Sequence, residues 1–228
     1  MTVTLITGAN KGLGYETARR LIAQGHRVYL GARSPELGEP AAAELAGQFV
    51  QLDVTDDQSV ENALRNIGEQ QGRLDVLVNN AGVSTVGEVN GPDALQLFDT
   101  NAIGVIRVTQ AALPLLEKSE NPVVVNVSSA LGSFWAVTNP ERRQFHFPSI
   151  VYGASKAAVS MLTVQYAKTY PDIKFNAVEP GFTATDLTPF SGAGQPVEQG
   201  AEVMVRMATI GKDGPTGTFQ ENEEELGW

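Results

Sequence analysis

The chain has 228 residues, a formal net charge of −10 at pH 7 and no cysteine. This length allows one well-buried α/β domain over residues 1–228 and is short for two. The acidic balance argues against nucleic acid and anionic membranes as partners, and the lack of cysteine excludes disulfides, thiolate metal sites and cysteine nucleophiles.

The first expected strand, residues 3–7, begins so early that we expect no signal or transit peptide. No apolar run approaches the roughly 20 residues that a membrane helix needs, so the cytoplasm is the expected location. The two histidines, His26 and His146, are too few and too far apart to predict a metal site.

A glycine-rich turn follows the first strand, with the spacing Thr7-Gly8-x-x-x-Gly12-x-Gly14, and a helical pattern begins there. Glycines let the backbone approach a pyrophosphate, and a helix N-terminus offers free N–H groups and a favourable dipole. The turn therefore predicts a phosphate cradle for a dinucleotide. Its expected contacts are Gly8, Asn10, Lys11, Gly12, Leu13 and Gly14.

The second expected strand, residues 27–31, is followed by Ala32 and Arg33. An NAD-binding protein usually places an acidic residue at this point to bind the ribose 2′-hydroxyl, whereas an arginine accommodates a 2′-phosphate. An acidic protein must also supply local positive charge to an anionic dinucleotide. Lys11 and Arg33 therefore predict NADP(H) as the cofactor.

Strands and helices alternate along the rest of the chain. Further strands are expected at 48–52, 74–78, 122–127, 173–178 and near 217–220, and helices at 13–24, 57–70, 93–118, 150–169 and 198–208. The segment 34–46 is short for a full helix, and we expect an abbreviated crossover there. The alternation predicts an α/β fold with one doubly wound parallel sheet of about seven strands, a Rossmann fold, with helices on both faces.

Tyr152 and Lys156 share one face of the helix expected at 150–169, because they are spaced i and i+4. An ammonium beside a phenol favours the phenolate and is expected to lower the phenol pKa toward the range useful for proton transfer. The pair predicts a proton-transfer device, although the same spacing taken alone is more often a surface feature.

Together these motifs resemble the short-chain dehydrogenase/reductase family, and within it the carbonyl reductases. The matching elements follow the family order: Thr7–Gly14, Asp53 after a strand, Asn79-Asn80-Ala81-Gly82, Asn101, Ser128-Ser129, Tyr152 with Lys156, and Pro180-Gly181. The resemblance covers nearly the whole chain.

The resemblance implies a catalytic group of Asn101, Ser129, Tyr152 and Lys156. Tyr152 would donate a proton to a carbonyl oxygen as hydride arrives from the nicotinamide, and Lys156 would lower the phenol pKa and bind the nicotinamide ribose. Ser129 would hold the substrate oxygen. Asn101 would keep a water near Lys156. Ser128 is expected to bind local backbone instead.

The resemblance also implies further cofactor contacts, for which Asn79 is a weaker candidate because it is expected to stabilise the central sheet. The contacts are Asp53 and Val54 near the adenine, Asn80, Ala81 and Gly82 after the fourth strand, Tyr152 and Lys156 on the helix, and Pro180, Gly181, Thr183 and Thr185 near the carboxamide and pyrophosphate.

Two segments depart from the usual family pattern. The stretch between Ser129 and Tyr152 is long and aromatic, and it either walls an apolar substrate pocket or packs on itself as a surface loop. A longer insertion there in monomeric carbonyl reductases leaves the oligomeric state open. The segment near 189–196, where substrate lids usually lie, is short and favours an open pocket. Candidate pocket walls are Phe134, Trp135, Phe182, Phe190 and Trp228, with a frayed terminus as the alternative for Trp228.

These features predict an NADPH-dependent reductase that transfers hydride to a small apolar ketone, aldehyde or quinone, with Tyr152 as the proton donor. Two alternatives stay open. One is an NADP-dependent alcohol dehydrogenase that works in the oxidative direction, and the other is a non-catalytic NADP(H)-binding regulatory protein. The intact catalytic group argues against the second.

Overall fold

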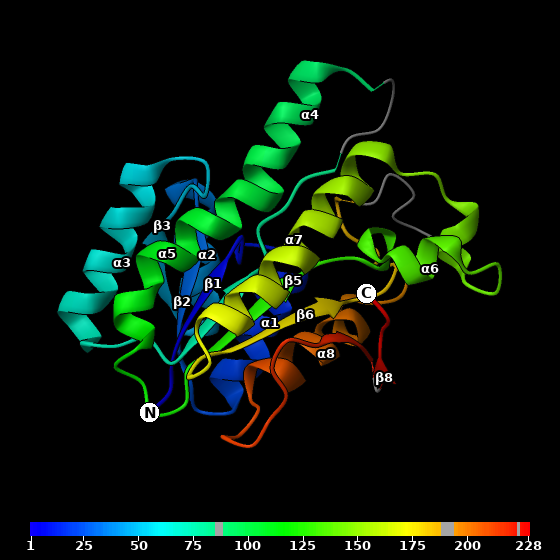
Figure 1. Cartoon of the computed structure of the whole chain (residues 1–228). Coiled ribbons are helices and arrows are strands. Elements are labelled where there is room, and N and C mark those ends of the chain that lie inside the picture. Colours follow the sequence, from blue (N-terminus) through cyan, green and yellow to red (C-terminus); the bar gives the residue numbers. More distant parts are fainter. Residues whose placement is uncertain (85–88, 188–193, 223) are drawn as a thin grey trace.

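The protein is organised by one sheet. Its strands are β1 (Val3–Thr7), β2 (Arg27–Ala32), β3 (Gln48–Gln51), β4 (Val76–Asn79), β5 (Val123–Val127), β6 (Lys174–Glu179), β7 (Phe219–Glu221) and β8 (Glu224–Glu225). The structure, a computed structural model, describes residues 1–84, 89–187, 194–222 and 224–228, and within these the sheet has eight strands in the order β3-β2-β1-β4-β5-β6-β7-β8 (Figure 1). All neighbouring strands are parallel except β7 and β8.

Helices connect the strands. They are α1 (Gly12–Ala23), α2 (Pro35–Leu45), α3 (Asp57–Gln71), α4 (Gly91–Phe98), α5 (Gly104–Leu116), α6 (Phe134–Thr138), α7 (Ile150–Thr169) and α8 (Val197–Ala208), with a π-helix η1 (Asp99–Ile103) and the 3₁₀ turns η2 (Ala130–Gly132) and η3 (Arg143–His146). Among the described residues, none of these helices has the length and apolar character needed to cross a membrane.

The sheet has a separate hydrophobic core on each face, because successive strand residues point to opposite sides. Leu5 and Leu77 belong to the core formed with α3, α5 and α7, whereas their neighbours Ile6 and Val78 belong to the core formed with α1, α2 and α8. Strands buried on both faces have continuous apolar runs, and the central strands β1 and β5 are buried along their whole length. The predicted doubly wound sheet is confirmed.

Three details of the expected elements were wrong. Residues 34–46 do not form an abbreviated crossover but contain the helix α2, whose buried face consists of Gly38, Ala41 and Ala42. A Cβ at Gly38 would lie 2.3 Å from the Phe49 ring, so this helix packs closely through small residues and shows no stripe of large apolar ones. The helix expected at 93–118 is interrupted by η1, and the two-residue strand β8 was not expected.

The strand order reverses beside β1, whose neighbours are β2 and β4. Open parallel sheets bind ligands at the carboxyl ends of the strands near this switch point. The segments that follow β1, β4, β5 and β6 therefore meet at one edge of the sheet.

Candidate active site

The glycine turn after β1 has a backbone that requires glycine. Gly8 and Gly12 have φ of +64° and +58°, in the left-handed region. A Cβ at Gly14 would lie 2.5 Å from Asn80 Nδ2 and 2.6 Å from the Gly8 carbonyl oxygen. Lys11 is the N-cap of α1 in extended backbone, so the first N–H groups of the helix face the turn. These features fit a bound dinucleotide phosphate.

The segment after β4 is tied to this turn by hydrogen bonds. Asn80 Nδ2 donates to the carbonyl oxygens of Thr7 (2.9 Å) and Gly8 (3.0 Å). Thr7 Oγ1 accepts from the backbone N–H groups of Asn80 (3.0 Å) and Ala81 (2.9 Å). The ends of β1 and β4 are thus fixed together, and Gly82 is placed where β4 leaves the sheet.

Gly82 lies beside two residues of the predicted catalytic group. A Cβ at Gly82 would lie 3.4 Å from Asn101 Oδ1 and 3.6 Å from Lys156 Nζ. Asn101 lies in η1, and single π-turns within helices are frequent at functional sites. Its side chain accepts from Val83 N (2.8 Å) and donates to Val83 O (2.9 Å) and Ser155 Oγ (3.1 Å). Asn101 therefore joins the segment after β4 to α7.

The two adjacent serines after β5 have different surroundings. Ser128 is buried, donates to the Lys156 carbonyl oxygen (3.0 Å) and lies 3.0 Å from Ser160 Oγ. Ser129 accepts from Leu131 N (3.2 Å) and is hydrogen-bonded through its side chain to Tyr152 and Glu179. Ser128 thus binds backbone, although that of α7 and not the local backbone expected for it, and the catalytic role of Ser129 stays a prediction.

Tyr152 and Lys156 lie on α7, which is held tightly against η2. A Cβ at Gly132 would lie 2.4 Å from the Lys156 carbonyl carbon. Lys156 Nζ donates to the Val127 carbonyl oxygen (2.8 Å) and lies 5.7 Å from the centroid of the Tyr152 ring. The structure thus brings Asn101, Ser129, Tyr152 and Lys156 together at the carboxyl edge of the sheet.

The pKa values of this pair are governed mainly by burial. Burial lowers the pKa of Lys156 to about 8, and an ionised Glu179 would oppose this shift. Burial raises the pKa of Tyr152, an ionised Glu179 would raise it further, and the hydrogen bond to Ser129 only partly opposes the rise. The phenol pKa is therefore raised and not lowered as the spacing of Tyr152 and Lys156 predicts, because desolvation of the buried phenol disfavours its charged form.

Glu179 is a site residue that the sequence analysis missed. It is the last residue of β6, is 7% exposed, and accepts hydrogen bonds from the backbone N–H groups of Ala130 and Gly181 (3.0 Å). The available signal was an acidic residue directly before Pro180-Gly181, at the end of a strand otherwise buried and largely apolar. A buried carboxyl without such partners would be costly.

The segment after β6 approaches the start of α1. A Cβ at Gly12 would lie 3.6 Å from Thr185 Cγ2, and a Cβ at Gly200 would lie 2.5 Å from Thr183 Oγ1 and 2.8 Å from Leu13 Cδ2. Pro180 and Gly181 precede this segment directly after Glu179. The predicted contacts of the glycine turn and of this segment are therefore close in space.

The two cations expected to face the dinucleotide, Lys11 and Arg33, differ in their surroundings. Lys11 Nζ forms an exposed ion pair with Asp186 (2.6 Å). Arg33 is exposed at the end of β2, and its charge acts on Asp53. The Asp53 pKa is lowered although burial opposes this, because Thr55 donates two hydrogen bonds to the carboxylate. Val54 packs against α5, where a Cβ at Gly104 would lie 3.0 Å from Val54 Cβ.

The aromatic stretch between Ser129 and Tyr152 is folded onto the C-terminal segment. Arg142 forms a bidentate ion pair with Glu221 (2.8 and 2.6 Å) and lies over the Trp135 ring. Trp135 N donates to the Trp228 carbonyl oxygen (2.9 Å), and the Trp228 ring lies 5.5 Å from that of Phe219. The alternative of a frayed terminus for Trp228 was therefore wrong.

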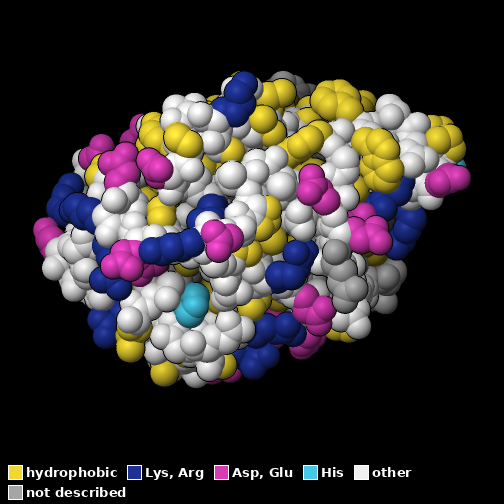
Figure 2. Space-filling view, turned by 60° about the horizontal axis from the view of Figure 1, so that its bottom comes forward, with side chains coloured by type: hydrophobic (Ala, Val, Ile, Leu, Met, Phe, Trp, Pro, Cys, Tyr) yellow, Lys and Arg dark blue, Asp and Glu magenta, His cyan; other side chains and the backbone are white. Residues whose placement is uncertain are grey.

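Several aromatic side chains of this region remain exposed, including Phe134, Trp135, Phe145 and Phe147. Figure 2 shows hydrophobic side chains gathered along the upper right of the view, the side on which α6 lies in Figure 1. Phe182 is 42% exposed after β6. Phe190 and most of the segment near 189–196 lie outside the described residues. The pocket walls stay a prediction.

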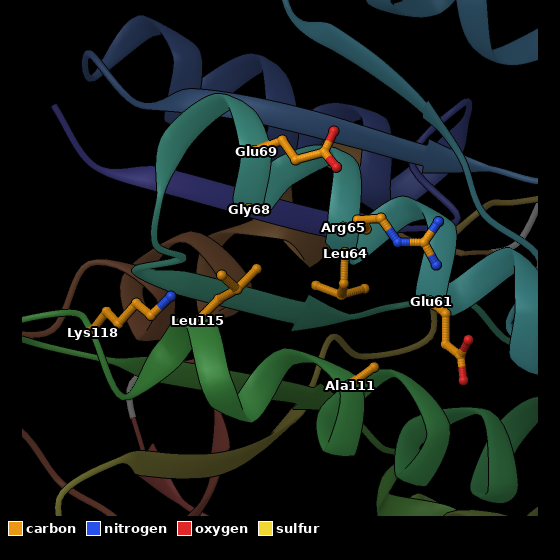
Figure 3. A pocket seen from close by; sticks show the side chains of 8 residues that line it. All are labelled: Glu61, Leu64, Arg65, Gly68, Glu69, Ala111, Leu115 and Lys118. Atoms are coloured by element: carbon orange, nitrogen blue, oxygen red, sulfur yellow. The ribbon is translucent and has the colours of Figure 1, made fainter.

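Two grooves of about 530 Å³ each lie away from this edge of the sheet. One lies between α3 and α5, with Leu64, Ala111 and Leu115 at its base and charged side chains such as Arg65 and Lys118 around it (Figure 3). The other includes Met1 and His26, at the opposite end of the strands. Neither contains a residue of the candidate active site.

Comparisons with known proteins agree with the order of these motifs. The family model for short chain dehydrogenases matches residues 2–195. "Short-chain dehydrogenase/reductase ATR10" from Stachybotrys chlorohalonatus is 36% identical, with 96% of this chain and 87% of that protein covered. (−)-Isopiperitenone reductase from Mentha piperita is 32% identical, with 97% of this chain and 96% of that protein covered.

Solved structures of the same kind superpose closely. NADPH-bound carbonyl reductase from chicken fatty liver has a TM-score of 0.86 at 26% identity, with 100% of both chains covered. Salutaridine reductase from Papaver somniferum has a TM-score of 0.82 at 29% identity, with 96% of this chain and 99% of that chain covered. The family that the motifs predict is confirmed: this chain belongs to the short-chain dehydrogenase/reductase family of oxidoreductases.

Proposed function

We propose that this protein is an NADPH-dependent reductase of small apolar ketones, aldehydes or quinones. The observation that carries the proposal is the convergence of Asn101, Ser129, Tyr152 and Lys156 beside the glycine turn. The relatives and structural neighbours named reductases, including one with bound NADPH, support reduction of a carbonyl group.

The residues of the turn would hold the dinucleotide, and NADPH when bound supplies the hydride. The N–H groups at the start of α1 and the space left by Gly14 suit the pyrophosphate. Exposed Arg33 at the end of β2 suits a 2′-phosphate. Because Lys11 is paired with Asp186, Arg33 is the stronger support for NADP over NAD.

Tyr152 is the proposed general acid. Its raised pKa keeps the hydroxyl protonated at neutral pH, as a proton donor requires. Ser129, hydrogen-bonded to Tyr152, would hold the carbonyl oxygen where negative charge develops. The Lys156 cation lies near the phenol, with Nζ 5.7 Å from the centroid of the Tyr152 ring. It would stabilise the phenolate left after proton transfer.

The test is NADPH oxidation with a panel of apolar ketones, aldehydes and quinones, run in parallel with NADH and with the corresponding alcohols and NADP⁺. Tyr152→Phe should lower kcat by about 10²–10⁴-fold, because the general acid is removed, while the Kd for NADPH changes little. Tyr170→Phe is the matched control, since Tyr170 caps the far end of the same helix.

Two results would contradict the proposal. Full activity of Tyr152→Phe would place the proton donor elsewhere. Tight NADPH binding without turnover of any carbonyl or alcohol would favour the regulatory alternative.

A further inference from the structure

A buried carboxyl lies directly behind the proposed catalytic serine. Glu179 ends β6 and is 7% exposed, and it is hydrogen-bonded to the Ser129 side chain. Its two oxygens also accept from the N–H groups of Ala130 and Gly181. Among the ion pairs of the described residues, none includes Glu179. The carboxyl is thus held by hydrogen bonds and not by an adjacent cation.

The hydrogens available to Ser129 restrict how this group can act. A serine hydroxyl has one hydrogen and two lone pairs, and an ionised carboxylate can only accept. Ser129 already accepts from Leu131 N. If Glu179 is ionised, Ser129 must donate its hydrogen to Glu179, and Tyr152 can then only donate to Ser129. Both hydrogens would point away from a substrate oxygen.

Protonation of Glu179 reverses this arrangement. The carboxylic O–H donates to the Ser129 oxygen, and the remaining lone pairs of Glu179 still accept from Ala130 and Gly181. The Ser129 hydrogen becomes free for another acceptor, and so does that of Tyr152.

We infer that protonated Glu179 is a positioning residue for Ser129, which turns the Ser129 hydrogen toward the substrate oxygen by donating its own hydrogen to the Ser129 oxygen. This inference rests on the proposed carbonyl reduction. Glu179 touches neither substrate nor reacting atoms in this role and acts through Ser129.

The surroundings of Glu179 favour its neutral form. The charged and titratable groups that face it are Tyr152 and Lys156 on α7, Glu221 on β7 and Arg142 before η3. Burial is the largest influence and raises the carboxyl pKa, and the Glu221 charge raises it further. The hydrogen bonds from Ala130, Ser129 and Gly181 oppose this without reversing it.

A pH dependence of reduction follows. As the pH rises through the raised pKa of Glu179, the carboxyl ionises and captures the Ser129 hydrogen, so kcat/KM falls. Glu179→Gln replaces the carboxylic O–H with an amide N–H that donates at every pH. The ratio of kcat/KM for Glu179→Gln to that of the wild type should therefore rise, by about tenfold for each pH unit above the carboxyl pKa.

Two further variants control this experiment. Glu179→Ala can neither donate to Ser129 nor capture its hydrogen, so the Ser129 hydrogen is free but no longer oriented; its kcat should lie below that of Glu179→Gln by the same factor at all pH values. Glu221→Gln removes a negative neighbour of Glu179 and frees Arg142, so it should lower the Glu179 pKa. The variant should keep the wild-type kcat/KM at low pH, and its kcat/KM should begin to fall at a lower pH than that of the wild type. Thermal unfolding of each variant establishes that it is folded.

An infrared measurement on the protein without cofactor tests the same inference independently of activity. In the wild type, a carboxylic C=O band should persist at pH values well above the ordinary glutamate pKa of about 4.3. This band should vanish in Glu179→Gln and shift in Ser129→Ala. If the wild-type protein reduces no carbonyl compound, the proposed function fails. The presence or absence of this band would still test whether Glu179 is protonated and bound to Ser129.

Three results would overturn the inference: no such band, a kcat/KM ratio that is independent of pH, or a Glu179→Gln variant as inactive as Glu179→Ala. Each result would show that Ser129 does not need protonated Glu179 to orient its hydrogen, and that Glu179 is either ionised in the active protein or has no role in positioning Ser129.

Discussion

Lys156 Nζ lies 5.7 Å from the centroid of the Tyr152 ring and donates a hydrogen bond to the Val127 carbonyl oxygen. The cation is therefore fixed beside the phenol by the end of β5. Lys156 is 4% exposed, and the cost of burying its charge lowers its pKa to about 8. The same enclosure raises the pKa of Tyr152. The site keeps a neutral phenol next to a readily deprotonated ammonium.

The buried Lys156 predicts a specific dependence of stability on pH. The ordinary pKa of a lysine side chain is 10.5 and that of Lys156 in the folded protein is about 8, so between these values the unfolded chain binds more protons. The free energy of unfolding contributed by Lys156 then rises with pH across this window. Urea unfolding of the wild type and of Lys156→Met should give a difference that grows in favour of the wild type from pH 8 to 10.5.

Lys168→Met provides the control, because Lys168 is exposed on the last turn of the same helix. Its difference from the wild type should show no comparable rise. A difference for Lys156→Met that stays constant over the window would mean that Lys156 is not desolvated in solution.

The adjacent serines should separate catalysis from stability. Ser129→Ala removes the proposed donor to the substrate oxygen and should lower kcat by about 10²–10³-fold with little loss of stability. Ser128→Ala removes the contacts with the Lys156 carbonyl and Ser160, and should cost about 1–3 kcal/mol of unfolding free energy with activity changed only a few-fold. Steady-state kinetics and urea unfolding of both variants make the comparison. The opposite pattern would reverse the assignment of the two serines.

Arg33 should determine the preference between the two dinucleotides. Arg33→Ala is expected to raise the KM for NADPH at least tenfold, since a charge-assisted hydrogen bond contributes about 1.5–3 kcal/mol, and to leave the KM for NADH nearly unchanged. Ala32→Asp should act in the same direction by repelling the 2′-phosphate.

Arg27→Ala is a suitable control for the same experiment, because Arg27 is exposed at the opposite end of β2. It should leave the ratio of the two KM values unchanged. An unchanged ratio in Arg33→Ala would remove Arg33 from the cofactor site.

Elements with strong local signals were predictable from the sequence. The strand at 3–7 and the helix at 150–169 agree with the structure at both ends, because an apolar run or a long helical pattern is bounded there by turn residues. The helix α2 was missed because its contact face is made of Gly38, Ala41 and Ala42, which give no periodic apolar stripe. The π-turn at Asn101 leaves no mark in the apolar periodicity of residues 93–118.

The amino-acid sequence alone was enough to predict the alternation of strands and helices apart from α2, the glycine turn after the first strand, and the spacing of Tyr152 and Lys156 on one helical face. These properties depend on neighbours within a few residues. Three features became apparent only from the contacts of the folded chain: Glu179 lies behind Ser129, burial raises the phenol pKa, and Trp228 packs on Phe219. Those outcomes depend on solvent exclusion and on contacts between strands far apart in the chain, and no local pattern encodes either.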